Sequence, residues 1–264
     1  MVLKHRAAIG GMQLDSVDNR ILVLGVASQA AKESEVTENR GGDGSRFVRV
    51  KRDSIEITVK VGIKAKRDDM AGREELMEEI VGWANNVPAW LSTDQKPDRR
   101  IWVESVRLPA AGDPWEWTNE FTLTFKACGV PYWQQIEPGI VSVRNVSNWG
   151  QYFGVPGNTN SVMNASFQNT SGSSCSSVKI TAGSSIIQLT DVGLANGETL
   201  VIDHREDGLL RIRIRNSGGT YRSVLNKRTA SSANDLNVKP GSQLIGLNAD
   251  KSGTVTFSCY GRFA

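Results

Sequence analysis

Apolar residues in this chain recur mostly at every second position, a spacing that is typical of β-strands with one buried face. In the C-terminal part, turn-forming pairs such as Asn196-Gly197, Asp207-Gly208 and Pro240-Gly241 separate the strand candidates. Strands spaced by about 8–12 residues with turns of this kind indicate a β-sandwich or jelly roll. The candidates in this part are residues 178–180, 185–189, 198–202, 210–214 and 254–260.

The N-terminal part combines strand candidates with a single helical pattern, over residues 69–85. There Leu76 and Ile80 belong to an apolar stripe with helical spacing, and Asp68 or Asp69 can cap the start. The strand candidates are residues 7–9, 21–27, 46–51, 54–61, 100–106 and 119–126. We therefore predict a mostly antiparallel sheet with one packed helix.

The chain divides into two parts of different composition. Its 264 residues predict two domains at about 150 residues per domain. Residues 1–150 carry 20 basic and 21 acidic residues and all seven tryptophans, whereas residues 151–264 carry 11 basic and 7 acidic residues. Glycine, proline and asparagine are enriched between them. We predict a domain over 1–137, a linker over 138–157 and a β-sandwich domain over 158–264.

Several classes of protein are excluded by simple counts. The longest apolar run, residues 21–27, has seven residues, against roughly 20 for a membrane-spanning helix. The N-terminus lacks the apolar stretch of a secretory signal. The three cysteines are too few and too scattered for a disulfide framework, so we expect folding in a reducing compartment. The net charge of +3 is too small to indicate nucleic acid as the main partner.

The sequence offers little for catalysis or metal binding. Its two histidines, His5 and His204, stand far apart, and no Cys-x-x-Cys or His-x-x-x-His spacing occurs. The nucleophile and phosphate-loop motifs are also missing. The densest acidic cluster, residues 74–79, lies on the polar face of the predicted helix, where a solvated surface explains it better than a pair of glycosidase carboxylates. We expect no enzyme, no cofactor and no metal.

A polar, glycine-rich segment over residues 32–45 has almost nothing to bury. We predict a long mobile loop there, because loops of this length in compact domains are usually functional or disordered. Five of its charged residues, Glu33, Glu35, Glu38, Arg40 and Asp43, are candidates for contact with a partner.

Two further patterns suggest contact surfaces. Period-two geometry places Arg211, Arg213 and Arg215 on one face of a strand, away from the isoleucines between them. A charged outer face that discourages aggregation is the favoured interpretation, and a basic stripe for an anionic partner is the alternative. Trp115 and Trp117 alternate beside a turn and are candidates for an exposed protein interface.

Two motifs carry a resemblance to a known family. Phe121, Leu123 and Phe125 form an alternating strand that runs into Pro131-Tyr132. Val238-Lys239-Pro240-Gly241 forms an apolar-x-Pro-Gly turn before the closing strands. With the order of the two domains, this pattern resembles the distal tail proteins of long-tailed siphophages over nearly the full chain.

The resemblance implies a mainly β fold, in which a tail-tube-like antiparallel domain with one packed α-helix is followed by a galectin-like β-sandwich. It implies a virion protein, assembled in the host cytoplasm, that forms a homohexameric ring at the distal end of a long non-contractile tail. The ring would join the tail tube protein to the tail-tip hub or tail-associated protein, and DNA would only pass through its lumen. The residues of the 32–45 segment would then contact an adjacent ring.

Further partners implied by the resemblance are the tape measure protein, a receptor-binding protein and host cell-wall carbohydrate. The alternative function is accordingly a carbohydrate-binding module of the tail tip that recognises the host.

Overall fold

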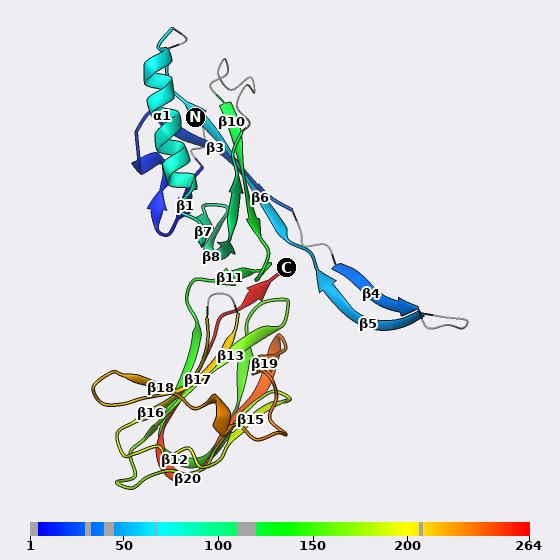
Figure 1. The fold of residues 1–264 in the computed structure, drawn as a ribbon, viewed down its shortest axis with the longest axis vertical. Helices are drawn as coiled ribbons and strands as arrows, with labels where there is room; N and C mark the ends of the chain where they lie inside the picture. Colours follow the sequence, from blue (N-terminus) through cyan, green and yellow to red (C-terminus); the bar gives the residue numbers. More distant parts are fainter. Residues whose placement is uncertain (1–4, 30–32, 40–44, 67, 110–119, 206–207) are drawn as a thin grey trace. The chain divides into compact units, whose positions relative to one another are not determined.

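The computed structural model describes residues 5–29, 33–39, 45–66, 68–109, 120–205 and 208–264, with the backbone alone between residues 33 and 52. It contains two compact units, residues 1–133 with Ala264, and residues 134–263 (Figure 1). Both units consist largely of antiparallel strands, and the described residues contain one α-helix. The predicted fold class, mainly β with one packed helix, is confirmed.

An antiparallel sheet forms one layer of the first unit. Its strand order is β3 (Ile21–Ser28), β6 (Ile55–Ile63), β10 (Glu120–Ala127) and β9 (Ser105–Arg107). Alternating side chains of β6, from Ile55 to Ile63, are buried, and so are Leu123 and Phe125 of β10. The opposite face is polar, and Lys60 pairs with Glu120 there. The period-two pattern thus determined which face of this sheet is buried.

A second set of strands in this unit has the order β2 (Met12–Gln13), β1 (Ala7–Ile9), β7 (Ala89–Thr93) and β8 (Lys96–Val103). The short 3-10 helix η1 (Leu14–Ser16) follows β2. Ile9, Leu91, Ile101 and Val103 are buried and contribute to the core of the unit. β11 (Trp133–Gln135) lies where the chain leaves this unit.

Helix α1 (Met70–Ala84) packs its predicted apolar stripe into the core. Leu76 and Ile80 are fully buried. The ring of Trp83 meets Phe125 edge to face with 5.9 Å between ring centroids, and its Nε1 donates a hydrogen bond to the carbonyl oxygen of Met12 at 2.8 Å. This helix is therefore held by contacts to two different sheets, as well as by its own hydrogen bonds.

The predicted mobile loop over residues 32–45 is wrong for its first half. Residues Glu33–Asn39 form β4, which pairs antiparallel with β5 (Ser45–Arg52) in a two-stranded sheet. The pairing register sets Glu33 opposite Arg52 and Glu38 opposite Arg46. Opposite charges at facing positions favour the pairing of two antiparallel strands. For this reason β4 can form a strand although its sequence offers no apolar face. The hairpin continues from β3 and β6, whose adjacent ends are paired at Ser28 and Ile57.

The second unit is one curled antiparallel sheet around a single core. The long strand β20 pairs through its C-terminal half with β13 and through its N-terminal half with β14, and β12 pairs with it on the other side. The strands of this sheet are β12 (Gly139–Val155), β13 (Ser161–Asn169), β14 (Val178–Ala182), β15 (Ser185–Leu189), β16 (Thr199–His204), β17 (Leu210–Arg215), β18 (Tyr221–Ser223), β19 (Asn237–Val238) and β20 (Gly241–Cys259). The unit also contains the 3-10 helix η3 (Leu225–Lys227) and the short strand β21 (Arg262–Phe263), which lies outside this sheet.

The predicted linker over residues 138–157 is also wrong, because β12 occupies most of it. Its glycines and asparagines have roles within the strand. Asn145 adopts a φ of 58° at an irregularity in the pairing between Val143 and Asn148, and such bulges bend a strand. A Cβ on Gly139 would approach the Phe153 ring to 2.9 Å. Glycine enrichment here reflects bending and close packing, which composition alone does not distinguish from a linker.

Candidate assembly surfaces

The three arginines of β17 lie on the outward side of the second unit, as the alternation predicts. Ile212 and Ile214 between them are buried in the core. Across the sheet, the pairing register sets Arg211 opposite Asp203 of β16 and Arg213 opposite Val201. The carboxylate of Asp203 is therefore placed within reach of two arginines.

Both of these arginines bind Asp203. Arg211 donates from Nε and Nη2 to the two carboxylate oxygens, at 3.0 and 2.7 Å, and Nη2 of Arg213 donates to Oδ2 at 2.7 Å. The guanidinium of Arg213 also lies 4.0 Å from the centroid of the Tyr221 ring. Arg215 is exposed and makes no ion pair with the described part of the chain. The stripe is thus partly neutralised by a carboxylate from the neighbouring strand, and its binding of an anionic partner stays a prediction.

Two half-buried tryptophans lie on the outward face of β7 and β8. Trp90 and Trp102 occupy paired positions, with 5.3 Å between ring centroids and an interplanar angle of 72°. The guanidinium of Arg100 lies 4.3 Å from the centroid of Trp90. Tryptophan and arginine are the residues that most often anchor protein interfaces. Sequence analysis did not single out these two rings, although the alternation of Trp102 with the buried Ile101 is the signal for its outward orientation.

The other aromatic candidates, Trp115 and Trp117, lie outside the described residues. So do Arg40 and Asp43 of the predicted contact loop. Glu33, Glu35 and Glu38 occupy alternate or near-alternate positions on β4, so they belong to a strand and not to a loop. Their contact with a partner stays a prediction.

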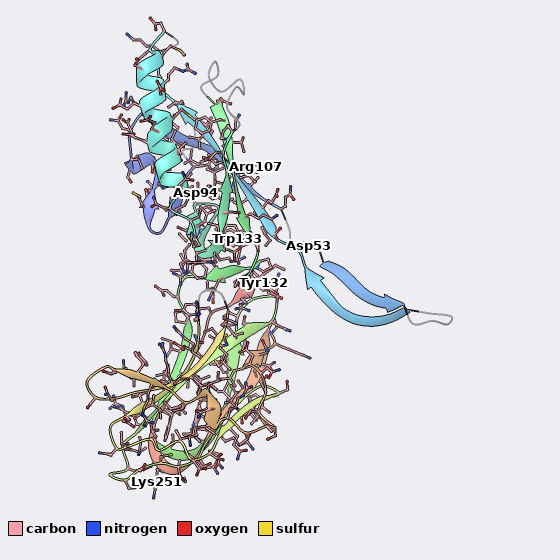
Figure 2. All side chains as sticks on the ribbon, viewed as in Figure 1. Asp53, Asp94, Arg107, Tyr132, Trp133 and Lys251 are labelled. Carbon is pink, nitrogen blue, oxygen red and sulfur yellow. The ribbon has the colours of Figure 1, made fainter. Side chains whose placement is uncertain are left out.

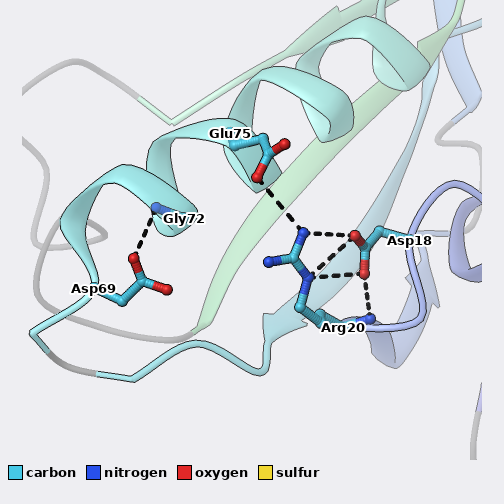
Figure 3. Close-up of polar contacts among 5 residues, drawn as sticks. All are labelled: Asp18, Arg20, Asp69, Gly72 and Glu75. Carbon is cyan, nitrogen blue, oxygen red and sulfur yellow. Dashed lines mark hydrogen bonds and ion pairs between the residues drawn. The ribbon is translucent and has the colours of Figure 1, made fainter.

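Polar contacts of Arg20 link the turn before β3 to helix α1 (Figure 3). Nε and Nη2 of Arg20 donate to Asp18, the latter at 2.7 Å, and Nη2 lies 3.7 Å from Oε2 of Glu75. The hydrogen bond with Asp18 raises the pKa of Arg20 above its usual value, so the arginine stays charged. At the helix start, Oδ1 of Asp69 accepts a hydrogen bond from the backbone N–H of Gly72 at 3.0 Å, which confirms the cap.

At the end of the first unit, the Trp133 ring (labelled in Figure 2) is buried and carries a cation on its face. Nζ of Lys96 lies 4.3 Å from the ring centroid. Burial, and then the nearby Arg99, lower the pKa of Lys96. The lysine therefore makes a cation–π contact with a buried aromatic ring.

The described residues contain no group of three or more His, Cys, Asp or Glu side chains that could hold a metal ion. In the same part of the chain, no helix has the length and apolar character to cross a membrane. The candidate surfaces for assembly are therefore the exposed faces of the sheets described above.

Comparisons with known proteins agree with this description. No protein-family model matches the chain, and no curated protein matches its sequence. Among solved structures, the chain is similar to the SPP1 Dit protein (gp 19.1), described as a paradigm of the hub adsorption apparatus in phages that infect Gram-positive bacteria. The TM-score is 0.65 at 13% identity, over 96% of this chain and 98% of that one.

The chain is also similar to chains of the phage P2 baseplate in its activated conformation. The TM-score is 0.52 at 8% identity for the form with Ca, over 99% of this chain and 98% of that one. It is 0.52 at 7% identity for the form with Sr, over 97% of each chain.

The chain therefore has the fold of the distal tail and baseplate proteins of phages. The resemblance predicted from the strand motif and the domain order is confirmed at the level of the fold. Since both units fall within the matched region, the likeness extends to the order of the two domains.

Proposed function

We propose that this chain is an architectural protein of a phage tail tip, which forms a homohexameric ring and joins the tail tube to the hub of the baseplate. The observation that carries this proposal is the fold likeness to SPP1 Dit, which covers 96% of this chain and 98% of the other. Because the match covers both chains almost from end to end, the likeness is not limited to one domain that the two proteins share. The proposed role is structural, with no substrate turned over.

The first unit is the part that we assign to the ring. It presents the outward pair Trp90 and Trp102 with Arg100, a combination suited to a subunit interface. A closed ring also pairs sheet edges between subunits and so removes them from solvent.

The hairpin of β4 and β5 is the part that we assign to contact with an adjacent ring of the tail. Its first strand carries three glutamates and its second strand carries four basic residues. These complementary strands give the hairpin groups of both signs, with which it can recognise a neighbouring subunit.

The charge of the first part suits a lumen through which DNA passes. Residues 1–150 carry 20 basic and 21 acidic residues. Since the affinity for DNA grows with each phosphate that a Lys or Arg neutralises, a nearly neutral wall does not hold the passing duplex.

The test is to determine the mass and symmetry of the purified full chain by mass photometry and electron microscopy class averages. The expected result is a sixfold annulus with six times the subunit mass of 28.8 kDa. A chain that stays monomeric at high concentration and is absent from purified tails would overturn the proposal.

A variant separates ring formation from attachment. Reversing Glu33, Glu35 and Glu38 to lysine should leave the annulus intact and prevent its joining to tail tubes. The matched control reverses two exposed glutamates of α1, Glu74 and Glu78, and should assemble as the parent chain does. Loss of the annulus in the hairpin variant would instead assign β4 to the contacts within the ring.

A further inference from the structure

Strand β12 is an open edge of the sheet in the second unit. Within the residues that the structure describes, it pairs with β20 and with no other strand. In Figure 1 these two strands run together. Because alternate residues of an antiparallel strand form hydrogen bonds on opposite sides, the 17 residues of β12 direct a long row of backbone N–H and C=O groups away from β20. Such a row is a template for pairing with a further strand.

The two strands at the ends of the same sheet, β15 and β18, are covered or short. Along β15, the backbone N–H of Ala233 donates to the carbonyl oxygen of Ile186 at 2.7 Å, and that of Thr229 donates to the carbonyl oxygen of Gln188 at 2.9 Å. β18 has three residues. Covering segments and short strands are common ways of protecting a sheet edge from other chains. Within the described part of the chain, β12 has neither.

The section of β12 from Asn148 to Val155 is the regular part of this edge. Its eight residues pair with β20 without a shift in register, whereas irregularities interrupt the pairing between Val143 and Asn148. Bulges, charged side chains and prolines discourage edge pairing. The section has no charged residue and no proline, since the one charge of β12 is Arg144. Its sequence therefore contains none of the usual protections.

The surroundings of this section are open on both faces of the sheet. Trp149 packs against the core and Phe153 is buried, but Gln151, which lies between them on the same face, is exposed. On the outward face, Tyr152 is 73% exposed. A Cβ added to the neighbouring Gly154 would meet nothing within 4 Å. A further strand can therefore approach the edge without displacing a side chain of the described residues.

We propose that this edge pairs with the same edge of a second copy of the chain, antiparallel, about a twofold axis at Gln151. Facing residues of an antiparallel pair point to the same side, so an axis placed at a residue keeps the core faces of the two sheets continuous. In this register Tyr152 lies opposite Gly150 of the second copy, and Asn148 lies opposite Gly154 of the second copy. Each larger outward side chain thus faces a glycine, which leaves room for it.

The residues on the core face fit the same register. Trp149 lies opposite Phe153 of the second copy, and aromatic residues are favourable cross-strand partners. The two Gln151 side chains lie opposite each other, and two primary amides can pair because each both donates and accepts. An axis one residue further along, at Tyr152, would instead set the polar Gln151 opposite Phe153.

The absence of charge favours a second copy as the occupant. A strand with a charge at the axis would repel its own copy, and residues 148–155 carry none. A twofold contact also covers the edges of both chains at once. A single strand pair is smaller than the about 1,200–2,000 Å² that a standard interface buries, so we expect weak, reversible association. All the residues involved belong to the second unit, and the pairing does not depend on the proposed ring.

The test is a disulfide cross-link at the proposed axis. The variant Q151C is made in a C128S background, because the other two native cysteines are buried. Facing residues of an antiparallel pair have Cα atoms about 4.5–5.5 Å apart, which a disulfide can span. Under mild oxidation, Q151C should give a covalent dimer with twice the subunit mass of 28.8 kDa on a non-reducing denaturing gel, whether or not the chain forms a ring.

Two matched variants in the same background control for register and for random collision. Y152C places its thiol one residue along the strand, where the proposed register sets the two copies diagonally, about 7–8 Å apart. S142C places an exposed thiol on the same strand beyond the bulge. Both should cross-link about tenfold more slowly than Q151C, because their Cα atoms lie outside disulfide range. Equal rates for the three variants, or faster cross-linking of Y152C, would overturn the inference.

Charge substitution at Gln151 tests the axis without a cross-link. In sedimentation velocity the parent assembly, whether one chain or a ring, should double in mass at high concentration. Q151K and Q151E should each lose this doubling, because like charges then face each other, and an equimolar mixture of the two should regain it. Thermal unfolding checks that each variant is folded. A parent that does not double, or a mixture that associates no better than either variant alone, would contradict the twofold pairing.

Discussion

The Cys175 thiol donates a hydrogen bond to Oδ1 of Asp250 across 2.8 Å, joining two positions 75 residues apart in the sequence. The same carboxylate accepts hydrogen bonds from the backbone N–H groups of Ser176 and Ser177, each at 3.1 Å, and from the Ser176 hydroxyl at 2.8 Å. Asp250 lies where β20 passes from pairing with β14 to pairing with β13. One side chain therefore ties the turn before β14 to the bend of the longest strand.

The electrostatics of this contact follow from its hydrogen bonds. Burial and then the hydrogen bond to Asp250 raise the pKa of Cys175 to about 12. Burial also acts to raise the pKa of Asp250, but the hydrogen bonds from Cys175, Ser177 and Ser176 outweigh it and hold that pKa well below the usual 3.8. The pair is thus a neutral thiol that donates to a carboxylate.

The first prediction concerns the stability that Asp250 contributes. D250N should lower the free energy of unfolding by about 1–2 kcal/mol at neutral pH, because it removes a charged acceptor at a partly solvated site. The folded pKa of Asp250 lies below the unfolded one, so its contribution is complete above pH 3.8 and is lost as the pH falls through the folded pKa. Urea denaturation of both proteins between pH 7 and pH 2.5 measures the difference.

The difference between parent and D250N should be constant above about pH 5 and shrink below the usual carboxylate pKa. The control is D98N, whose carboxylate has only Arg99 as an ion-pair partner in the described part of the chain. A difference that grows as the pH falls would contradict the assigned direction of the pKa shift.

The second prediction concerns thiol reactivity. Cys128 is exposed, whereas Cys175 and Cys259 are buried, and burial raises the pKa of Cys259 to about 11. A thiol reagent at pH 8 should therefore modify Cys128 in the native chain and reach the other two only after unfolding, since the thiolate is the reactive form. Counting thiols with Ellman's reagent should give one in buffer and three in guanidinium chloride. The variant C128S should give none in buffer, and rapid native labelling of Cys175 would contradict the structure.

The third prediction concerns the arginine stripe. D203N removes the carboxylate that Arg211 and Arg213 share, and should strengthen retention on heparin, used as a polyanionic probe, while lowering stability by about 1 kcal/mol. The matched control D191N removes a charge of the same sign from a turn of the same unit. Equal retention of the two variants would show that the stripe gains nothing locally from losing Asp203, which argues against the anionic-partner hypothesis.

The fourth prediction concerns the helix cap. D69A should lower the free energy of unfolding by about 1 kcal/mol, because the backbone N–H of Gly72 loses its acceptor at the start of α1. The neighbouring D68A is the control, since Asp69, and not Asp68, forms the cap. Chemical denaturation compares the two, and an equal effect would mean that the loss comes from charge near the helix start.

Local pattern was sufficient for much of the fold. The alternation of apolar residues along β6 predicted its buried isoleucines and valines. The apolar stripe of residues with helical spacing, preceded by Asp69, predicted both ends of α1 to within one residue. The strand from Phe121 to Phe125 supplied the resemblance that the fold comparisons support. These features depend on neighbours close in sequence, whose spacing already determines which side of an element is apolar.

The features that sequence reasoning missed depend on partners distant in the chain. β12 was taken for a linker because its glycines acquire a role only opposite Gly246 and against Phe153. β4 is a strand only because β5 lies across from it. Sequence reasoning had no signal for the exposure of Tyr152, since the face of a strand that meets solvent is known only once its sheet has a core.

The sequence by itself determined the type of strongly periodic elements such as β6 and α1, and the likeness in fold to the phage tail proteins. The tertiary structure alone decided which polar residues neutralise one another, as Asp203 does for Arg211. It also decided which side chains, such as those of Asn148 and Asn248, make no hydrogen bond with the residues that the structure describes. The physical reason is that periodicity is a property of a few consecutive residues. Pairing across a sheet joins residues tens of positions apart, and their register is determined by the packing of the whole core.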